Sequence, residues 1–244
     1  MAGQDEAAVV IPAYDEADTI ADVARRARAQ LRRVIVIDDG STDGTAERLQ
    51  GLDVTVLRNG ENCGKAVSLW RGMQKALADG ADAVITLDAD GQHRPEDIPQ
   101  LLEQARRHPG LLIVASRLRR VEAPPPLRLF ANRCANFWIS WASGYRIHDT
   151  QSGFRLYPAA LLQRLPAPRG RSSGFVFESE VLIEAAWQGV LSLPVIIDSI
   201  YPKASRPSHY RPALDTLRIA QMVALRLLRR GLYPVGLWRS LQRG

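Results

Sequence analysis

Two aspartates stand two residues apart, directly after an apolar run. Asp88 and Asp90 follow residues 83–87 (AVITL), and Gln92 comes two positions later. If the run is a strand, the turn leaving it lets both carboxylates reach one hard cation, with the amide oxygen of Gln92 beside them. An isolated pair of this spacing more often caps a turn. Because further acids follow other apolar runs, we expect a metal site here and not a simple turn cap. The sequence predicts that Asp88, Asp90 and Gln92 bind Mg²⁺ or Mn²⁺, whose other ligands are water and a diphosphate.

Further acids do follow other apolar runs, at residues 8–12 (AVVIP) and 34–37 (VIVI). Because the carboxyl ends of parallel strands meet at one edge of a sheet, where ligands bind, these acids should share that edge. Asp39 can accept a hydrogen bond from a base N–H or a ribose hydroxyl. Asp38 is nearer the strand and is the more structural candidate. The acids expected at the edge are Asp15, Glu16, Asp38, Asp39, Asp88 and Asp90.

The elements that must position these acids alternate between short apolar runs and helical stretches. Such alternation predicts an α/β fold with a mainly parallel sheet flanked by helices. We expect one domain over residues 1–211 and a basic amphipathic helical extension over residues 212–244. The expected strands are 8–12, 34–37, 54–57, 83–87, 111–115, 153–157 and 191–200. The expected helices are 18–29, one from about 45, 65–78, one from 95, 127–141, 178–188 and 212–228.

Charge is unevenly distributed along the 244 residues. The chain carries +6 in total, and 46% of its residues are hydrophobic, which excludes a disordered protein. Residues 201–244 hold nine basic residues and one acidic residue, a local charge of +8, which leaves −2 for the first 200 residues. A near-neutral body with a basic tail does not fit a nucleic-acid-binding protein, so no nucleic-acid partner is expected.

The cysteine content and the hydropathy pattern restrict where the protein works. Cys63 and Cys134 have neither disulfide nor zinc-site spacing. The sequence contains no run of 18 apolar residues and no signal-peptide pattern at its start. We therefore expect a cytoplasmic protein that is peripheral on the cytoplasmic face of a membrane.

Six motifs in order resemble the family-2 glycosyltransferases of the GT-A fold. Within that family the likeness is greatest to dolichyl-phosphate or polyprenyl-phosphate sugar synthases. The resemblance extends over about residues 7–200. Its motifs are residues 10–16 (VIPAYDE), 37–45 (IDDGSTDGT), 62–66 (NCGKA), 88–93 (DADGQH), 149–155 (DTQSGFR) and 175–180 (FVFESE).

The resemblance implies a transfer of sugar from a UDP- or GDP-linked donor. It places the phosphate-binding arginines of the family at Arg117 and Arg133. After the last strand, residues 201–211 (YPKASRPSHYR) carry basic groups in a register that differs from those synthases. The resemblance also assigns Pro12, Tyr14, Glu16, Ile37 and Asp39 to the nucleoside, and Asp88, Ala89, Asp90 and Gln92 to the diphosphate and metal.

The acceptor decides whether the reaction needs a base. A hydroxyl must lose a proton as it attacks, whereas a phosphate monoester is mostly ionised at neutral pH and needs arginines. Attack from the face opposite the leaving group would invert the anomeric configuration. A lipid phosphate is the main expectation, and a hydroxyl on a glycolipid or membrane pigment is the alternative. The candidate phosphate ligands are Arg117, Arg133 and Arg155, and the candidate bases are Asp149, Glu178 and Glu180.

The tail helix suggests a membrane surface. When the helix expected over 212–228 is projected as far as residue 230, Arg218, Arg226, Arg229 and Arg230 fall in one angular sector, which suits an anionic lipid surface. The alternative is a terminal helix packed on the body. A non-catalytic membrane-docking scaffold would keep this tail without needing the acids of residues 88–92. Hydride transfer is disfavoured because no GxGxxG motif follows a strand.

Overall fold

The computed structural model describes residues 6–116, 126–168, 174–197 and 212–242. Within them, seven strands form one sheet in the order β3-β2-β1-β4-β6-β5-β7. β6 is antiparallel to both of its neighbours and the other pairs are parallel, which confirms the expected mainly parallel sheet. The strands are β1 (Ala7–Ala13), β2 (Arg33–Asp38), β3 (Thr55–Arg58), β4 (Ala83–Thr86), β5 (Leu112–Ser116), β6 (Arg155–Pro158) and β7 (Ser192–Ile196).

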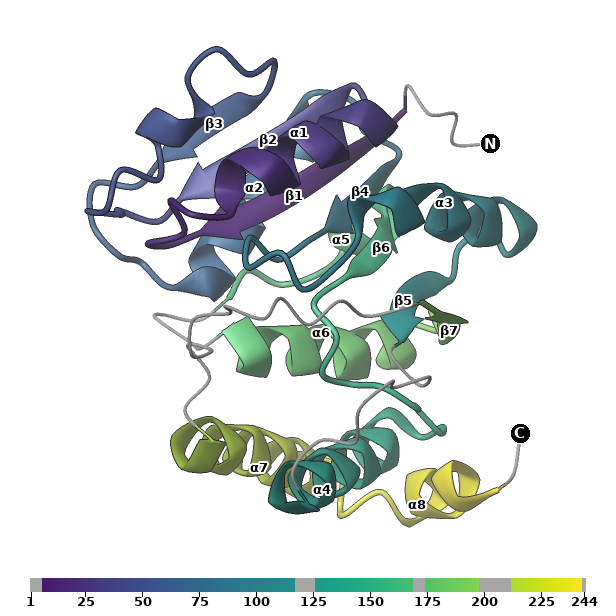
Figure 1. Ribbon diagram of the computed structural model, residues 1–244. Coiled ribbons are helices and arrows are strands. Elements are labelled where there is room, and N and C mark those ends of the chain that lie inside the picture. Colours follow the sequence, from purple (N-terminus) through teal and green to yellow (C-terminus); the bar gives the residue numbers. More distant parts are fainter. Residues whose placement is uncertain (1–5, 117–125, 169–173, 198–211, 243–244) are drawn as a thin grey trace.

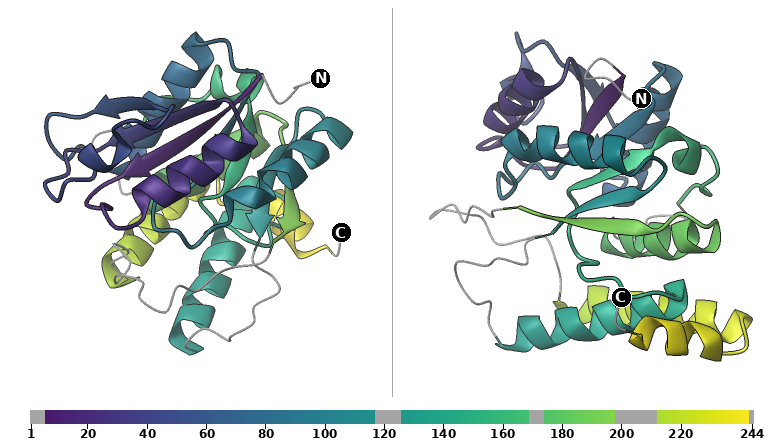
Figure 2. Two further views of the ribbon diagram at one scale, coloured as in Figure 1. Left: turned by 45° about the horizontal axis from the view of Figure 1, so that its top comes forward. Right: turned by 90° about the vertical axis from the view of Figure 1, so that its right-hand side faces the viewer.

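Helices cover both faces of the sheet because side chains alternate along each strand. In β1, Val9 and Ile11 enter one core with α1 and α3, whereas Val10 enters the other with α2 and α6. A further layer of α4, α7 and α8 lies beyond α6 (Figures 1 and 2). The helices are α1 (Ile20–Gln30), α2 (Lys65–Ala78), α3 (Ile98–Arg107), α4 (Pro126–Ser143), α5 (Ala159–Leu162), α6 (Gly174–Trp187), α7 (Pro212–Arg229) and α8 (Pro234–Leu241).

Two expected helices differ from the structure. The helix expected from about residue 45 is only a 3-10 turn, η1 (Glu47–Leu49), because Gly44 and Gly51 on either side adopt positive φ angles of 91° and 77°. A second 3-10 turn, η2 (Pro95–Asp97), precedes α3. The helix expected from residue 178 begins four residues earlier, at Gly174, so the motif at 175–180 is helical.

Close packing of α2 on the sheet fixes the position of its first residue, Lys65. A Cβ atom added to Gly72 would lie 2.4 Å from side-chain atoms of both Val10 and Ile37. No side chain larger than hydrogen fits there without movement of the sheet or the helix. Gly72 thereby lets α2 approach β1 and β2 closely, and it holds the start of α2 at the carboxyl edge of these strands.

The terminal helices pack on the body. Ile219, Met222, Val223 and Leu227 of α7 are buried in the core that also contains α4 and α6. The indole N–H of Trp141 donates to the carbonyls that begin the turn into α8. Among the described helices, none combines the length and apolar character needed to cross a membrane. The division at residue 211 stays a prediction.

Candidate active site

The segments that follow β1 and β2 are tied together at the carboxyl edge of the sheet. The hydroxyl of Ser41 accepts a hydrogen bond from the Asp15 N–H at 2.9 Å, and the hydroxyl of Thr45 accepts one from the Glu16 N–H at 2.8 Å. Tyr14 and Glu16 are partly exposed beside these bonds. The segment expected to hold a nucleoside is therefore rigid, and a ligand can reach it.

Asp39 organises the start of α2. One carboxylate oxygen accepts hydrogen bonds from the Asn59 amide at 2.7 Å and the Cys63 N–H at 2.9 Å, and the other accepts one from the Gly64 N–H at 2.8 Å. The Cys63 and Gly64 N–H groups lie at the N-terminus of α2, where a negative charge is favourable. Asp39 is 3% exposed. Its carboxylate therefore holds the loop that carries Lys65, while its contact with a nucleoside stays a prediction.

Other residues of the expected donor site lie inside the fold. Asp38 is fully buried, accepts a hydrogen bond from the Ser41 N–H at 3.0 Å and pairs with Arg58 at 3.1 Å, as a structural residue would. Ile37 and Ala89 are also buried, at 0% and 4% exposure, and Pro12 is buried beside Ile37 in the sheet. A ligand could reach these residues only through their backbone or by a local rearrangement.

A lysine bridges two carboxylates at the end of β4. The Lys65 ammonium lies 2.7 Å from Asp88 Oδ1 and 3.1 Å from Glu178 Oε1. Lys65 and Asp88 side chains are each 25% exposed, and that of Glu178 is 4% exposed. Burial lowers the pKa of Lys65, but the charges of Asp88 and Glu178 outweigh burial and raise the pKa above its ordinary value. The ammonium therefore stays charged at neutral pH.

His93 packs against Asp88 of this cluster. Its side chain is buried, its Nε2 atom lies 3.9 Å from Asp88 Oδ2, and its ring meets that of Phe154 edge-on at 5.3 Å. The last residue of the motif at 88–93 thus packs against the first. This contact keeps the turn after β4 compact around Asp88.

The turn after β4 suits a hard divalent cation that arrives with further ligands. Asp90 accepts a hydrogen bond from the Gln92 N–H at 2.9 Å, so this turn folds back on itself. In the described part of the chain, no group of three or more His, Cys, Asp or Glu side chains is placed to hold a metal ion alone. Mg²⁺ commonly takes one or two carboxylates together with water and substrate phosphates. The oxygen donors of Asp88, Asp90 and Gln92 fit that partial set, and their role as ligands stays a prediction.

Arg155 is a buried framework residue. It is 0% exposed, and its guanidinium donates to the carbonyls of Ser152 at 2.7 Å, Glu178 at 2.7 Å and Thr150 at 2.9 Å. Burial lowers the pKa of Arg155, but interactions that include Tyr157 and Glu178 outweigh it and raise the pKa. In this position the guanidinium joins α6 to the loop before β6, and its contact with a phosphate stays a prediction.

Two further candidates, Asp149 and Arg133, belong to the loop before β6 and to α4. Asp149 accepts hydrogen bonds from the Gln151 N–H at 3.0 Å and the Ser116 hydroxyl at 3.3 Å. Arg133 is exposed on α4, three residues before Asn136, whose side chain bonds residues 148 and 150. Arg133 is therefore about one helical turn from the loop that carries Asp149. Arg117 and the basic segment 201–211 lie outside the described residues.

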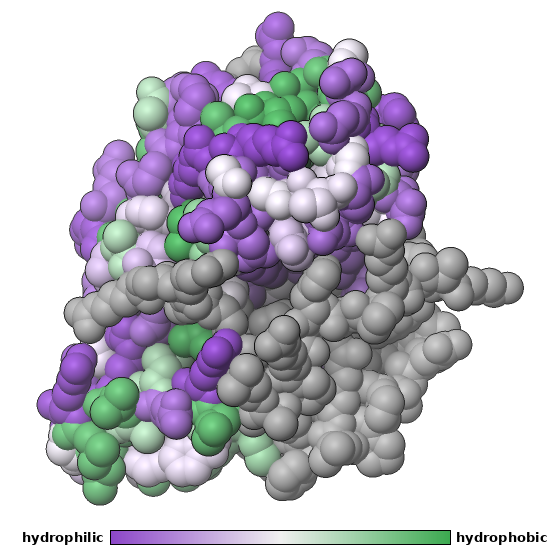
Figure 3. Space-filling model, turned by 90° about the vertical axis from the view of Figure 1, so that its left-hand side faces the viewer, coloured by the Kyte–Doolittle hydropathy of each residue, from purple (hydrophilic) through white to green (hydrophobic). Residues whose placement is uncertain are grey.

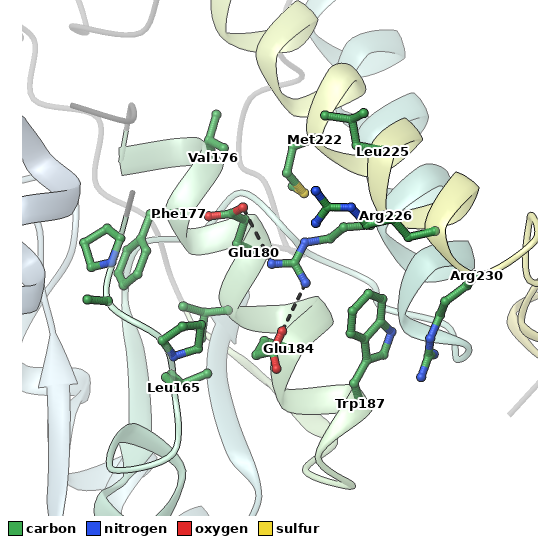
Figure 4. A pocket seen from close by; sticks show the side chains of 15 residues that line it. Leu165, Val176, Phe177, Glu180, Glu184, Trp187, Met222, Leu225, Arg226 and Arg230 are labelled. Carbon is green, nitrogen blue, oxygen red and sulfur yellow. Dashed lines mark hydrogen bonds and ion pairs between the residues drawn. The ribbon is translucent and has the colours of Figure 1, made fainter. Parts of the chain in front are cut away.

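Glu180 faces away from the Lys65 cluster. Arg226 of α7 pairs with Glu180 at 3.6 Å and with Glu184 at 3.1 Å, as Figure 4 shows. The three side chains line a cavity of about 550 Å³ between α6, α7 and residues 165–168. Arg230 lies over the Trp187 ring at 4.2 Å. Two glutamates of one motif thus serve different sites, because Glu178 faces Asp88 and Glu180 faces α7.

Sequence reasoning gave no role to Lys65 or His93. Both stand inside motifs that were recognised, but neither spacing nor periodicity shows that Lys65 reaches across to Asp88 and Glu178. One signal was available. A lysine directly after a strand-end loop and Gly64, at the first position of a helix, is placed to meet anionic groups at that edge.

Replacing Arg155 tests its framework role. We expect Arg155→Met to lower the free energy of unfolding by about 3–5 kcal/mol, because three buried carbonyls lose a charged donor. Urea unfolding followed by circular dichroism measures the effect. Arg164→Met is the matched control, since Arg164 is exposed and donates to the nearby carbonyl of Ala160. This substitution should change the free energy of unfolding by no more than about 0.5 kcal/mol. Equal effects of the two substitutions would contradict the assignment.

Comparison with known proteins places this arrangement in a family. Residues 8–165 match the sequence model of the family described as "Glycosyl transferase family 2". An undecaprenyl-phosphate 4-deoxy-4-formamido-L-arabinose transferase of Pseudomonas paraeruginosa is 32% identical over 181 residues, which are 69% of this chain and 52% of that protein. The chain thus spans about half the length of that relative. A UDP-N-acetylglucosamine–dolichyl-phosphate N-acetylglucosaminyltransferase of Methanococcus voltae is 28% identical over 218 residues, 81% of this chain and 86% of that protein.

A solved structure agrees on the fold. Glucosyl-3-phosphoglycerate synthase from Mycobacterium tuberculosis, in complex with Mn²⁺, UDP and glucosyl-3-phosphoglycerate, superposes with a TM-score of 0.65 at 22% identity. The match covers 93% of this chain and 81% of that one. Together with the family match over more than half of the sequence, this likeness shows that the chain belongs to glycosyl transferase family 2 and is a glycosyltransferase with the GT-A fold.

Proposed function

We propose that this glycosyltransferase moves a sugar from a nucleoside-diphosphate sugar to a polyprenyl phosphate at a membrane surface, with Mg²⁺ or Mn²⁺ and with inversion at the anomeric carbon. The observation that carries the proposal is the meeting of Asp39, Lys65 and Asp88 at the carboxyl edge of the sheet, linked through the start of α2. The names of the two sequence relatives, which carry undecaprenyl phosphate and dolichyl phosphate, support a lipid-phosphate acceptor.

The donor would lie along this edge. Tyr14, Glu16 and Asp39 border the end proposed for the nucleoside, whether uridine or guanosine, and Asp88 and Asp90 border the end proposed for the diphosphate. A divalent ion bound by Asp88, Asp90 and Gln92 would supply positive charge to the departing diphosphate. The protein's part is to hold these oxygen atoms in place through the tied loops after β1, β2 and β4.

Transfer requires one bond to break and one to form. The bond between the anomeric carbon and the diphosphate oxygen breaks, and its electron pair leaves with the nucleoside diphosphate. An oxygen of the acceptor phosphate forms the new bond to the same carbon from the opposite face, which inverts its configuration. No proton has to be removed, because this phosphate is already ionised near neutral pH.

A phosphate acceptor suits the glutamates better than a hydroxyl acceptor does. Glu178 is paired with Lys65 at 3.1 Å, and Glu180 is paired with Arg226 at 3.6 Å. Both carboxylates are thus already engaged in ion pairs that belong to the fold. Arg133, exposed on α4, offers the charged fork that a phosphate requires. We therefore assign the acceptor phosphate to the side of the site that Arg133 borders.

The outermost helical layer suits a membrane surface. Of the twelve exposed large hydrophobic side chains among the described residues, nine lie on α4, α7, α8 and the turn between α7 and α8. Figure 3 shows hydrophobic and hydrophilic residues mixed at the lower left of the molecule. Such a mixture is typical of helices that lie in a lipid interface. The nine are Phe137, Trp138, Leu217, Leu225, Leu228, Leu232, Val235, Trp238 and Leu241.

The face of α7 that points outward is not the arginine face that the sequence predicts. Arg226 points inward to Glu180 and Glu184, whereas Leu217 and Leu228 are 55% and 64% exposed. Leucines rather than arginines therefore form the centre of the proposed lipid-facing stripe, with exposed arginines beside it. We propose that this stripe keeps the protein peripheral, on the cytoplasmic face.

The donor assignment is tested by binding and by one substitution. We expect a UDP- or GDP-sugar with Mn²⁺ to raise the melting temperature of the wild-type protein, and Asp90→Ala to reduce transfer at least about a thousandfold, a loss of about 4 kcal/mol of transition-state stabilisation. Asp79→Ala, in an exposed helix-end pair with Lys75, is the control and should keep normal turnover. Normal turnover by folded Asp90→Ala would refute the metal role, and no thermal shift with any such donor would refute the donor class.

Two substitutions with opposite expected effects test the acceptor assignment. We expect Arg133→Ala to lower kcat/KM for a polyprenyl phosphate about a hundredfold, because a charged contact to phosphate is lost. Glu180→Gln should retain turnover within about threefold. The measurement is initial rate against acceptor concentration. The reverse pattern, with Glu180→Gln inactive and Arg133→Ala unaffected, would support transfer to a hydroxyl.

Membrane attachment is tested on the exposed stripe of α7. The double variant Leu217→Ser with Leu228→Ser should weaken binding to anionic vesicles by about 2–3 kcal/mol, roughly 30-fold to 160-fold, because two leucines no longer enter the lipid. Co-sedimentation measures this loss, and donor binding should not change. Leu191→Ser, at an exposed leucine next to β7, is the control. Unchanged vesicle binding by the double variant would refute the stripe, whereas vesicle binding without any donor binding would favour a scaffold.

A further inference from the structure

The ammonium of Lys65 occupies the space between two acidic side chains that belong to distant parts of the chain. Lys65 begins α2, Asp88 follows β4, and Glu178 lies in the first turns of α6. The ammonium is 2.7 Å from one carboxylate and 3.1 Å from the other. We propose that Lys65 is a resident cation, which holds Asp88 and Glu178 together until the nucleotide brings a divalent ion into the site. This inference rests on the donor site proposed above.

Two glycines make room for this cluster. A Cβ atom added to Gly153 would lie 2.7 Å from Asp88 Oδ2 and 3.1 Å from Glu178 Oε1. A Cβ atom added to Gly174 would lie 2.5–2.8 Å from three carbons of the Lys65 side chain. Neither glycine has a positive φ angle. Their lack of a side chain therefore serves close packing around the cluster, and not a special backbone conformation.

Contacts outside the cluster fix the position of each of its three residues. The Asp39 carboxylate binds the N–H of Gly64, the residue before Lys65, at 2.8 Å. Arg155 binds the Glu178 carbonyl at 2.7 Å, and His93 packs behind Asp88. The ammonium is thus positioned by the fold from both sides. A surface lysine that had paired with the nearest acid by chance would have no such supports.

The arrangement makes metal binding depend on the nucleotide. A divalent ion that uses Asp88 must share a carboxylate whose charge Lys65 already balances, so metal without nucleotide gains little. A diphosphate brings oxygen anions that can serve both Lys65 and the divalent ion. Binding of nucleotide and binding of metal are then mutually favourable, and by linkage each must raise the affinity of the other by the same factor.

The experiment measures Mn²⁺ affinity in the absence of donor sugar, by electron paramagnetic resonance of free Mn²⁺. We expect Lys65→Met to bind Mn²⁺ alone at least about tenfold more tightly than wild type, because two carboxylates then face each other without a cation. Lys65→Arg keeps the charge and should stay within about threefold of wild type. Lys65→Met with Glu178→Gln removes one charge of each sign and should return the affinity to near the wild-type value.

A second arm adds UDP, and separately GDP, to each protein. In wild type the preferred nucleotide should tighten Mn²⁺ binding strongly, and in Lys65→Met this factor should fall at least about fivefold. Circular dichroism shows whether Lys65→Met folds. If it does not, Lys65→Gln replaces it and is judged by the same Mn²⁺ affinities, because its amide can still donate a hydrogen bond to one carboxylate. Mn²⁺ affinity that is unchanged or weaker in the folded neutral variant overturns the inference. If neither nucleotide tightens Mn²⁺ in wild type, the proposed donor site fails, and the metal-alone arm still decides the role of Lys65.

Discussion

Charge balance at the carboxyl edge of the sheet is the constraint on which the site depends. Strand-end loops place several acids there, and carboxylates left close together would repel one another. The fold meets this problem with cations and backbone donors of its own: Lys65 lies between Asp88 and Glu178, and backbone N–H groups at the start of α2 hold Asp39. The acids are thereby fixed in place before any ligand binds. A site built in this way is preorganised at the cost of a reduced attraction for cations.

Local patterns were enough to predict the parts of the fold that depend on local sequence. The apolar runs before Asp39 and Asp88 indicated buried strands, and both aspartates do follow strands of one mainly parallel sheet. The antiparallel direction of β6 could not be predicted, because a run of residues has the same hydropathy in either direction. Arg155 shows a second limit. The sequence offers Arg155 as a candidate phosphate ligand, but it cannot show that the side chain is buried, because that burial depends on carbonyls that approach from the loop before β6 and from α6.

The tail helix shows why charge alone is a poor guide to the face that a helix exposes. Helical projection grouped Arg226 with Arg218 and Arg229, and all three could have met an anionic surface. In the structure, Arg226 is drawn inward because Glu180 and Glu184 on α6 provide partners, and the Trp187 ring lies 5.1 Å from its guanidinium. The projection contains no information about α6. Leu228, which a globular helix would be expected to bury, is 64% exposed instead.

Helix α6 connects the Lys65 cluster to α7. Glu178 and Glu180 are two residues apart, so their side chains point about 160° away from each other around the helix axis. One faces the Lys65 ammonium, and the other faces Arg226 on the helix that carries the exposed leucine stripe. Arg155 fixes the backbone of α6 at Glu178 from the sheet side. A shift of α7 would therefore act on the same short helix segment that completes the donor site, whereas the nucleoside end, built by the loops after β1 and β2, does not depend on α6.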